Sequence, residues 1–494
     1  MFSVNAPGFL VFLAILLAVW YRLPARRRWL AMLAASLFFY LSLDIPGFFV
    51  LLASAAVVWV CARGAAPGAP ARRRWLAAGL AAALGPLLLL KYYAMFAGTL
   101  NGLLGLTLWQ GQGLIQPLGL AYYSLQLTAY LLDVHRGETP PEPNFARVLC
   151  YTSFFLSITQ GPFNRYSTLM PALDSTPAFS AQRLKYGAAR MAWGYFKKYA
   201  IAERAAVVVD TVFANAYDLD RSQLIFGVVM FAFQLYADFS GYTDIVLGAG
   251  EAMGLTLPEN FRQPYLSATI GEFWERWHIS LSHWLQEYVF EPLVWTGWTS
   301  RLPVVGRFFA KPPVNASLLI TFLVSGLWHG AAWNYVVWGL LNGAYQVVSG
   351  LTRRWRKKRW KQLGVKPKSR WHHAFQVAFV FVFICIGYVF FRAGSFGEAV
   401  SFLGYLVFPS IEGVRVFSMY WLLGLSSRLD LVMLLAGVAV LVAVDLLHER
   451  GIRLRKRLFA SPLPVRWLIY ECAIFAFLLM GKFLSDGAFL YARF

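Results

Sequence analysis

The sequence predicts an all-α, polytopic transmembrane protein with about 11–12 crossings and re-entrant segments. Apolar residues make up 59% of the 494-residue chain, and only 14% are charged, against about 25% in an ordinary soluble protein. Lys and Arg number 45 and Asp and Glu 24, for a net charge of +21, and the basic residues fall between apolar runs. These figures exclude a soluble globular enzyme, a disordered chain and a typical nucleic-acid-binding protein.

The crossings follow from the length of the apolar runs. A helix needs about 20 apolar residues to cross a bilayer, or about 17 when its flanking side chains reach the interface. The predicted crossings are 8–21, 29–43, 46–62, 75–95, 114–132, 186–213, 223–250, 316–332, 333–351, 372–391, 431–447 and 466–485. The first two are short, and 316–351 can be divided differently. Residues 148–163 are apolar but end in Gln160-Gly161-Pro162, which predicts a broken or re-entrant segment.

Four basic clusters predict the orientation. They lie at 22–28, 63–74, 353–370 and 450–457, and such clusters are retained in the cytoplasm. With the N-terminus outside, they follow the first, third, ninth and eleventh crossings, so all four are cytoplasmic and both termini are extracytoplasmic. The first apolar run is followed by arginines, which is typical of a start-transfer helix rather than a cleaved signal peptide.

Residues 1–494 are expected to form a single transmembrane domain, because no internal repeat of the kind found in many transporters is evident. Three segments are interpreted as hydrophilic loops: 63–74, 351–371 and 448–466. The long segment 251–315 is mixed in polarity. Within it, Glu272–Phe290 predicts one amphipathic helix, because apolar side chains recur at steps of three and four: Phe273, Trp277, Leu281, Trp284 and Tyr288.

No metal site is predicted. The four cysteines lie in apolar stretches without a CxxC spacing, which is typical of small buried hydrophobic residues: Cys61, Cys150, Cys385 and Cys472. HExxH, Walker A, GxGxxG and GxSxG motifs are absent from the sequence. An ordinary serine hydrolase is therefore not expected.

Two carboxylates, Asp238 and Asp244, lie six residues apart in an apolar run, with Ser240, Tyr242 and Thr243 between them. A charge inside the bilayer costs about 2.5–3.5 kcal/mol on insertion scales, so such residues are functional candidates. Three interpretations remain open: a helix-packing network, a proton relay and the lining of a substrate path.

Two histidines lie in segments rich in apolar and aromatic residues: His329 in Gly326–Gly330 and His278 in Glu275–Ser280. A neutral imidazole is the natural general base near pH 7, although a lone histidine among Trp and Gly is equally well a core residue. His283, one turn beyond His278, is placed to face the same side. Histidines without a serine nucleophile suggest the transfer of an activated group to an incoming hydroxyl.

Two motifs carry a resemblance to a known family. Asp238–Glu287 contains DFSGY, PENF followed by Pro-Tyr, and FWERWHISLSHW in that order, and the second motif is GLWHG at 326–330. With these motifs the chain resembles the membrane-bound O-acyltransferases (MBOAT). The branch is that of the alginate O-acetyltransferases, with the D-alanyl-teichoic-acid transferases as second choice. The signature core is about 227–350, and weaker matches run from Phe38 to the C-terminus.

The resemblance implies an MBOAT-type helical fold around a central tunnel or funnel. It implies that His329 is the essential residue, acting as the base, and that His278 positions or relays. Further residues are implied to line the tunnel or support it: Asp238, Ser240, Tyr242, Asp244, Asn260, Arg276, Trp277 and Trp328.

The resemblance also implies the substrates and partners. No cofactor is expected to be bound permanently, and acetyl-CoA or another acyl thioester, on CoA or a carrier protein, is the cytoplasmic donor. Arg276 and the basic clusters would attract such an anionic donor, although topology explains the clusters equally well. The other expected partners are membrane lipid and an extracytoplasmic SGNH-type acyltransferase or polysaccharide. The expected function is O-acetylation of an exported, alginate-like polysaccharide at a bacterial inner membrane.

Alternatives remain open. Glu291–Trp295 departs from the PLGG run of alginate-type members, which leaves D-alanyl transfer to teichoic acid as an alternative, while Phe489-Leu490-Tyr491 favours the alginate-type branch. A transporter or flippase would explain the carboxylates and the Gly-Pro break but predicts inverted repeats. A catalytically silent assembly protein of the same fold is the third alternative.

Overall fold

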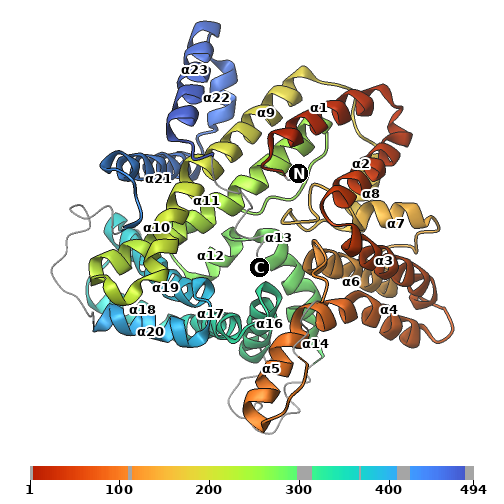
Figure 1. Ribbon diagram of the computed structural model, residues 1–494, viewed down its shortest axis with the longest axis horizontal. Coiled ribbons are helices and arrows are strands. Elements are labelled where there is room, and N and C mark those ends of the chain that lie inside the picture. Colours follow the sequence, from red (N-terminus) through yellow and green to blue (C-terminus); the bar gives the residue numbers. More distant parts are fainter. Residues whose placement is uncertain (1–3, 110–113, 297–313, 367–368, 409–422, 484–494) are drawn as a thin grey trace. The chain divides into compact units, whose positions relative to one another are not determined.

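A computed structural model describes residues 4–109, 114–296, 314–366, 369–408 and 423–483. Within these ranges the chain is mostly helical (Figure 1), and an isolated antiparallel bridge joins Phe261 to Trp277. The chain forms two compact units. Unit 1 holds the described residues up to Gly194 together with Tyr242–Glu259, and unit 2 holds Tyr195–Gly241 and the described residues from Asn260 onward.

Unit 1 is built from the N-terminal helices. Helices α3, α4 and α6 pack against one another, and α2 packs against α7 and α8. The helices are α1 (Pro7–Arg22), α2 (Arg28–Leu43), α3 (Ile45–Ala65), α4 (Arg72–Leu87), α5 (Tyr93–Leu104), α6 (Leu120–Arg136), α7 (Phe145–Thr152), α8 (Tyr166–Asp174), most of α9 (Ala181–Phe196) and the C-terminal part of α11 (Arg221–Met253).

Unit 2 begins at the end of α9 and contains the N-terminal two thirds of α11. Helices α16 and α17 lie side by side, and α17 also packs against α19 (Figure 1). The helices are η3 (Lys197–Ala202), α10 (Glu203–Ala214), α12 (Ile270–Arg276), α13 (Ile279–Leu285), η6 (Gln286–Phe290), α14 (Glu291–Trp295), α16 (Val314–His329), α17 (Trp333–Leu351), α18 (Arg353–Gln362), α19 (Arg370–Arg392), α20 (Phe396–Val407), α21 (Arg428–Glu449), α22 (Leu454–Ala460) and α23 (Leu463–Met480).

The all-α prediction is confirmed for the described residues. Each of the twelve predicted crossings lies mainly on helical residues, but 114–119, 330–332 and 481–483 are not helical, and 484–485 lie outside the described residues. Six helices of the described ranges are long and apolar enough to cross a membrane: Ile45–Ala65, Arg72–Leu104, Arg221–Met253, Arg370–Arg392, Arg428–Glu449 and Leu463–Met480. Three more apolar helices are shorter. The chain is therefore a multi-pass membrane protein.

The break predicted within 148–163 is confirmed, because α7 ends at Thr152 and the buried chain beyond it is not helical until Tyr166. Two of the predicted hydrophilic loops, 351–371 and 448–466, instead contain the short helices α18 and α22. Their Arg- and Lys-rich sequences are good helix formers, which a judgement from polarity alone overlooks.

The single amphipathic helix predicted over Glu272–Phe290 is wrong. The chain leaves the helix at Trp277 and His278, so that α12 and α13 are separate. The reason is tertiary: the backbone at this point pairs with residues 260–262 instead of with its own preceding turn. Apolar periodicity cannot reveal such a break, because the spacing of the side chains continues across it.

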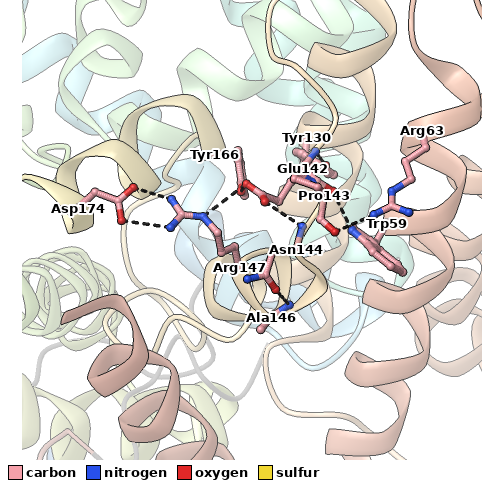
Figure 2. Close-up of polar contacts among 10 residues, drawn as sticks. All are labelled: Trp59, Arg63, Tyr130, Glu142, Pro143, Asn144, Ala146, Arg147, Tyr166 and Asp174. Atoms are coloured by element: carbon pink, nitrogen blue, oxygen red, sulfur yellow. Dashed lines mark hydrogen bonds and ion pairs between the residues drawn. The ribbon is translucent and has the colours of Figure 1, made fainter. Parts of the chain in front are cut away.

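A polar network fastens the segment between α6 and α7 to the rest of unit 1 (Figure 2). The Arg147 guanidinium donates to both carboxylate oxygens of Asp174, at 2.6 and 3.1 Å. The Tyr166 hydroxyl donates to the Glu142 carboxylate, and the backbone nitrogen of Glu142 donates to the Tyr130 hydroxyl. Hydrogen bonding to Asp174 raises the pKa of Arg147. Because the Arg147, Glu142 and Tyr166 side chains bind one another or Asp174, we interpret the network as structural.

Candidate active site

His278 lies between α12 and α13, with its backbone in the left-handed region at φ 44° and ψ 51°. Two backbone hydrogen bonds flank it: the Arg262 nitrogen donates to the Arg276 carbonyl, and the Ile279 nitrogen donates to the Asn260 carbonyl, both at 3.0 Å. The histidine is 2% exposed. Burial lowers the pKa of the His278 imidazole to about 3, so the ring is neutral near pH 7.

Aromatic rings hold the imidazole of His278. Phe239 of α11 meets it edge to face with the ring centroids 4.7 Å apart, and Trp328 of α16 lies 5.9 Å away. The neighbouring Trp277 contacts a cluster of aromatic side chains, formed by Tyr236, Phe261, Tyr265, Phe273 and Tyr388. The two adjacent side chains therefore have different partners, Trp277 in the packing and His278 beside Trp328.

His329 is the last residue of α16 and is 4% exposed. Its ring centroid lies 4.9 Å from that of Trp328, 5.0 Å from Trp338 and 5.4 Å from Phe391. Trp328 therefore contacts both histidines. The two motifs that lie about 50 residues apart in the sequence meet at this indole within unit 2.

The glycines that surround His329 are required by the close approach of α16 and α17. A Cβ atom on Gly326 would lie 2.3 Å from the Tyr335 carbonyl oxygen, and one on Gly330 would lie 2.2 Å from the Tyr335 ring. Both distances are far below van der Waals contact, so a side chain at 326 would push the backbone of α17 away, and one at 330 would displace the Tyr335 ring. The glycines thus set the position of His329 relative to Trp338 on α17.

In unit 2, the polar residues of α11 are engaged by lysines of η3. The Lys198 ammonium lies 2.7 Å from the Asp238 carboxylate and 2.6 Å from the Glu203 carboxylate. Lys197 donates to the Ser240 hydroxyl at 2.8 Å. The side chains of Lys198 and Asp238 are each 2% exposed. A buried, paired carboxylate of this kind supports the helix-packing interpretation.

In unit 1, the C-terminal part of the same motif has its own partners. The Arg190 guanidinium lies 2.8 Å from the Asp244 carboxylate and also binds Glu259. The Tyr242 and Thr159 hydroxyls are 2.6 Å apart. The sequence interpretation missed Lys198 and Arg190 as partners, although both are charges within or beside an apolar run and could have been flagged by the rule that identified Asp238.

Arg276 binds two carboxylates, Glu272 at 2.6 Å and Glu449 of α21 at 2.8 Å. Hydrogen bonding to Glu449 raises the pKa of Arg276. Because two negative groups already surround this guanidinium, its local charge does not favour capture of an anionic donor. His283 is exposed, whereas His278 is buried.

The left-handed backbone conformation of His278 predicts a difference in thermal stability between two of its variants. A non-glycine residue in this conformation costs about 1–2 kcal/mol, a cost that glycine does not bear. We expect the His278→Gly variant to be more stable than His278→Ala by about 1 kcal/mol, measured as a higher midpoint of thermal unfolding in detergent. Ser280, inside α13, is the control, because Ser280→Gly should be less stable than Ser280→Ala. An equal or higher midpoint for His278→Ala would contradict the strain.

A family model and several relatives match this chain. The model, described as the membrane-bound O-acyltransferase family, matches residues 135–393. The "probable alginate O-acetylase" of Azotobacter vinelandii is 32% identical over 409 residues, covering 81% of this chain and 76% of the relative. The peptidoglycan O-acetyltransferase of Helicobacter pylori is 29% identical, covering 78% and 74%. The teichoic acid D-alanyltransferase of Bacillus subtilis is 28% identical, covering 57% and 70%.

Proposed function

The chain belongs to the membrane-bound O-acyltransferase family, and from that membership we propose that it transfers an acetyl group from a thioester to a hydroxyl of an exported polysaccharide. The observation that carries the assignment of the site is the contact of both His278 and His329 with Trp328. Because the chain belongs to an acyltransferase family, the carboxylates and the Gly-Pro break no longer require a transporter to explain them.

His329 acts as the base in this proposal. The acceptor oxygen attacks the thioester carbonyl while its proton passes to the imidazole, the carbon–sulfur bond breaks, and the thiolate leaves and takes up a proton. His278 positions the reacting groups or relays the proton. Its ring stays neutral near pH 7, which supports the positioning role, because burial disfavours the protonated form.

The donor and the orientation belong to the same proposal. Acetyl-CoA or another acyl thioester enters from the cytoplasm, and the acceptor is a polysaccharide or an extracytoplasmic acyltransferase of the SGNH type. The protein resides in a bacterial inner membrane with both termini extracytoplasmic. The support for this orientation is the even number of predicted crossings together with the four basic clusters. No permanently bound cofactor is required.

D-alanyl transfer to teichoic acid is the second candidate, and the similarity to the Bacillus subtilis D-alanyltransferase supports it. The two candidates differ in the ester that is formed. We expect deletion of the gene in its own host to remove acetate, and not D-alanine, from the mild-alkali hydrolysate of the extracellular polymers, measured by mass spectrometry.

The same experiment includes its control. A plasmid copy of the gene should restore the acetate, and the amount of polymer should be unchanged in all strains. Loss of D-alanine esters would favour the second candidate, and an unchanged ester content of every polymer would contradict both.

A further inference from the structure

Asn260 holds the chain at the turn that carries His278. It lies beyond the end of α11 and is 0% exposed. Its backbone carbonyl accepts from the Ile279 nitrogen at 3.0 Å. Its side-chain oxygen accepts from the Ser280 nitrogen at 3.3 Å and from the Ser280 hydroxyl at 2.6 Å. One residue therefore binds the chain at both positions that follow His278.

These contacts matter because of where α13 starts. The first nitrogens of a helix have no partner in their own helix, and they require an acceptor from elsewhere. Asn260 supplies that acceptor to the first two residues of α13, Ile279 and Ser280. The N-cap residue His278 makes no side-chain cap hydrogen bond. Asn260, from another segment, supplies the acceptor that an N-cap side chain usually provides.

Without this external cap, the sequence favours one continuous helix. The apolar spacing from Phe273 to Trp284 runs unbroken through the turn. In a continuous helix, His278 would adopt the right-handed conformation instead of φ 44°. Its side chain would then leave from the backbone in another direction, and the present contacts with Phe239 and Trp328 would be lost.

We propose that Asn260 is a positioning residue for acyl transfer, whose side-chain oxygen keeps His278 out of the helix and its imidazole against Trp328. This inference rests on the proposed role of His278. It assigns a role to the PENF segment, which acts through the backbone of the RWHIS segment and without touching the substrate.

Three variants distinguish an effect on the position of His278 from a general loss of protein stability. Asn260→Ala removes the oxygen that Ser280 binds but leaves the backbone bond to Ile279. Asn260→Asp keeps an oxygen in the same place, and no described residue binds the side-chain nitrogen that it replaces. Asn342→Ala is the matched control, because Asn342 is also buried, at 1% exposed, and its side-chain nitrogen donates to the Trp338 carbonyl within α17.

Two measurements are made on the full-length chain. In lipid nanodiscs, hydrogen exchange of the peptide that covers 276–282 should be about tenfold faster in Asn260→Ala than in the wild type, Asn260→Asp or Asn342→Ala. In the gene-deletion host, the initial rate of polymer ester formation, normalised to the amount of protein in the membrane, should fall ~10–100-fold in Asn260→Ala. Asn260→Asp should recover most of that rate, and Asn342→Ala should retain it.

The outcomes distinguish this inference from the proposed function. Unchanged hydrogen exchange at 276–282 in Asn260→Ala would contradict the proposal that the Asn260 side chain holds this turn in place. Faster exchange with an unchanged rate of ester formation would overturn the positioning role, provided that His329→Ala abolishes the rate. A rate that His329→Ala also leaves unchanged would contradict the proposed function itself. Equal losses in Asn260→Ala and Asn260→Asp would show that the side-chain oxygen is not what matters.

Discussion

Replacement of His329 by alanine is expected to abolish polymer acylation while the protein still inserts into the membrane. A positioned general base contributes about 10²–10⁴-fold to a rate. The rings that contact His329 belong to Trp328, Trp338 and Phe391, none of which accepts a proton. The measurement is the ester content of the extracellular polymer in the gene-deletion host complemented with each variant.

His373→Ala is the matched control for this experiment. His373 is an exposed histidine near the start of α19, and the proposed mechanism does not use it. It should leave acylation unchanged. Normal acylation by His329→Ala, with the protein present at the wild-type level in the membrane, would contradict the assignment of His329 as the base.

Replacement of Lys198 by methionine is expected to cause the largest loss of stability. The substitution keeps an unbranched side chain of similar length but leaves the carboxylates of Asp238 and Glu203 facing one another without their shared cation. Breaking a buried pair in this way costs about 3–5 kcal/mol. We expect a much lower midpoint of thermal unfolding of the purified protein, followed by tryptophan fluorescence in detergent.

Because Lys198 is shared by two carboxylates, loss of the lysine and loss of one carboxylate should cost different amounts of stability. Asp238→Asn should cost less than Lys198→Met, because Glu203 still balances the ammonium. The double variant should recover part of the loss, since one of the two carboxylates that share the Lys198 ammonium loses its charge. Lys185→Met is the control, because Lys185 is exposed on α9, and its midpoint should be unchanged. Equal midpoints for Lys198→Met and the wild type would contradict a structural role for this triad.

Much of the helical architecture was predictable. Each of the twelve apolar runs lies mainly on helical residues of the described ranges, and the break before Gly161-Pro162 was also anticipated. His278 and His329 were singled out because a polar residue in apolar company is costly, which is a property of the local sequence. The partners of the polar residues were not predictable in the same way. Lys198 lies 40 residues from Asp238, and Glu449 lies 173 residues from Arg276.

The sequence by itself determined the membrane class and most of the helices, and it singled out two histidines as candidates. In lipid, each backbone polar group must be satisfied within its own segment, so the length of an apolar run already specifies a helix. Only the tertiary structure decided where the amphipathic helix is interrupted, because the acceptor that breaks it, Asn260, comes from another segment. It also decided that both histidines contact Trp328, since that contact depends on how α16 packs against the turn at His278. Such contacts are set by packing between segments, and no local pattern of residues encodes them.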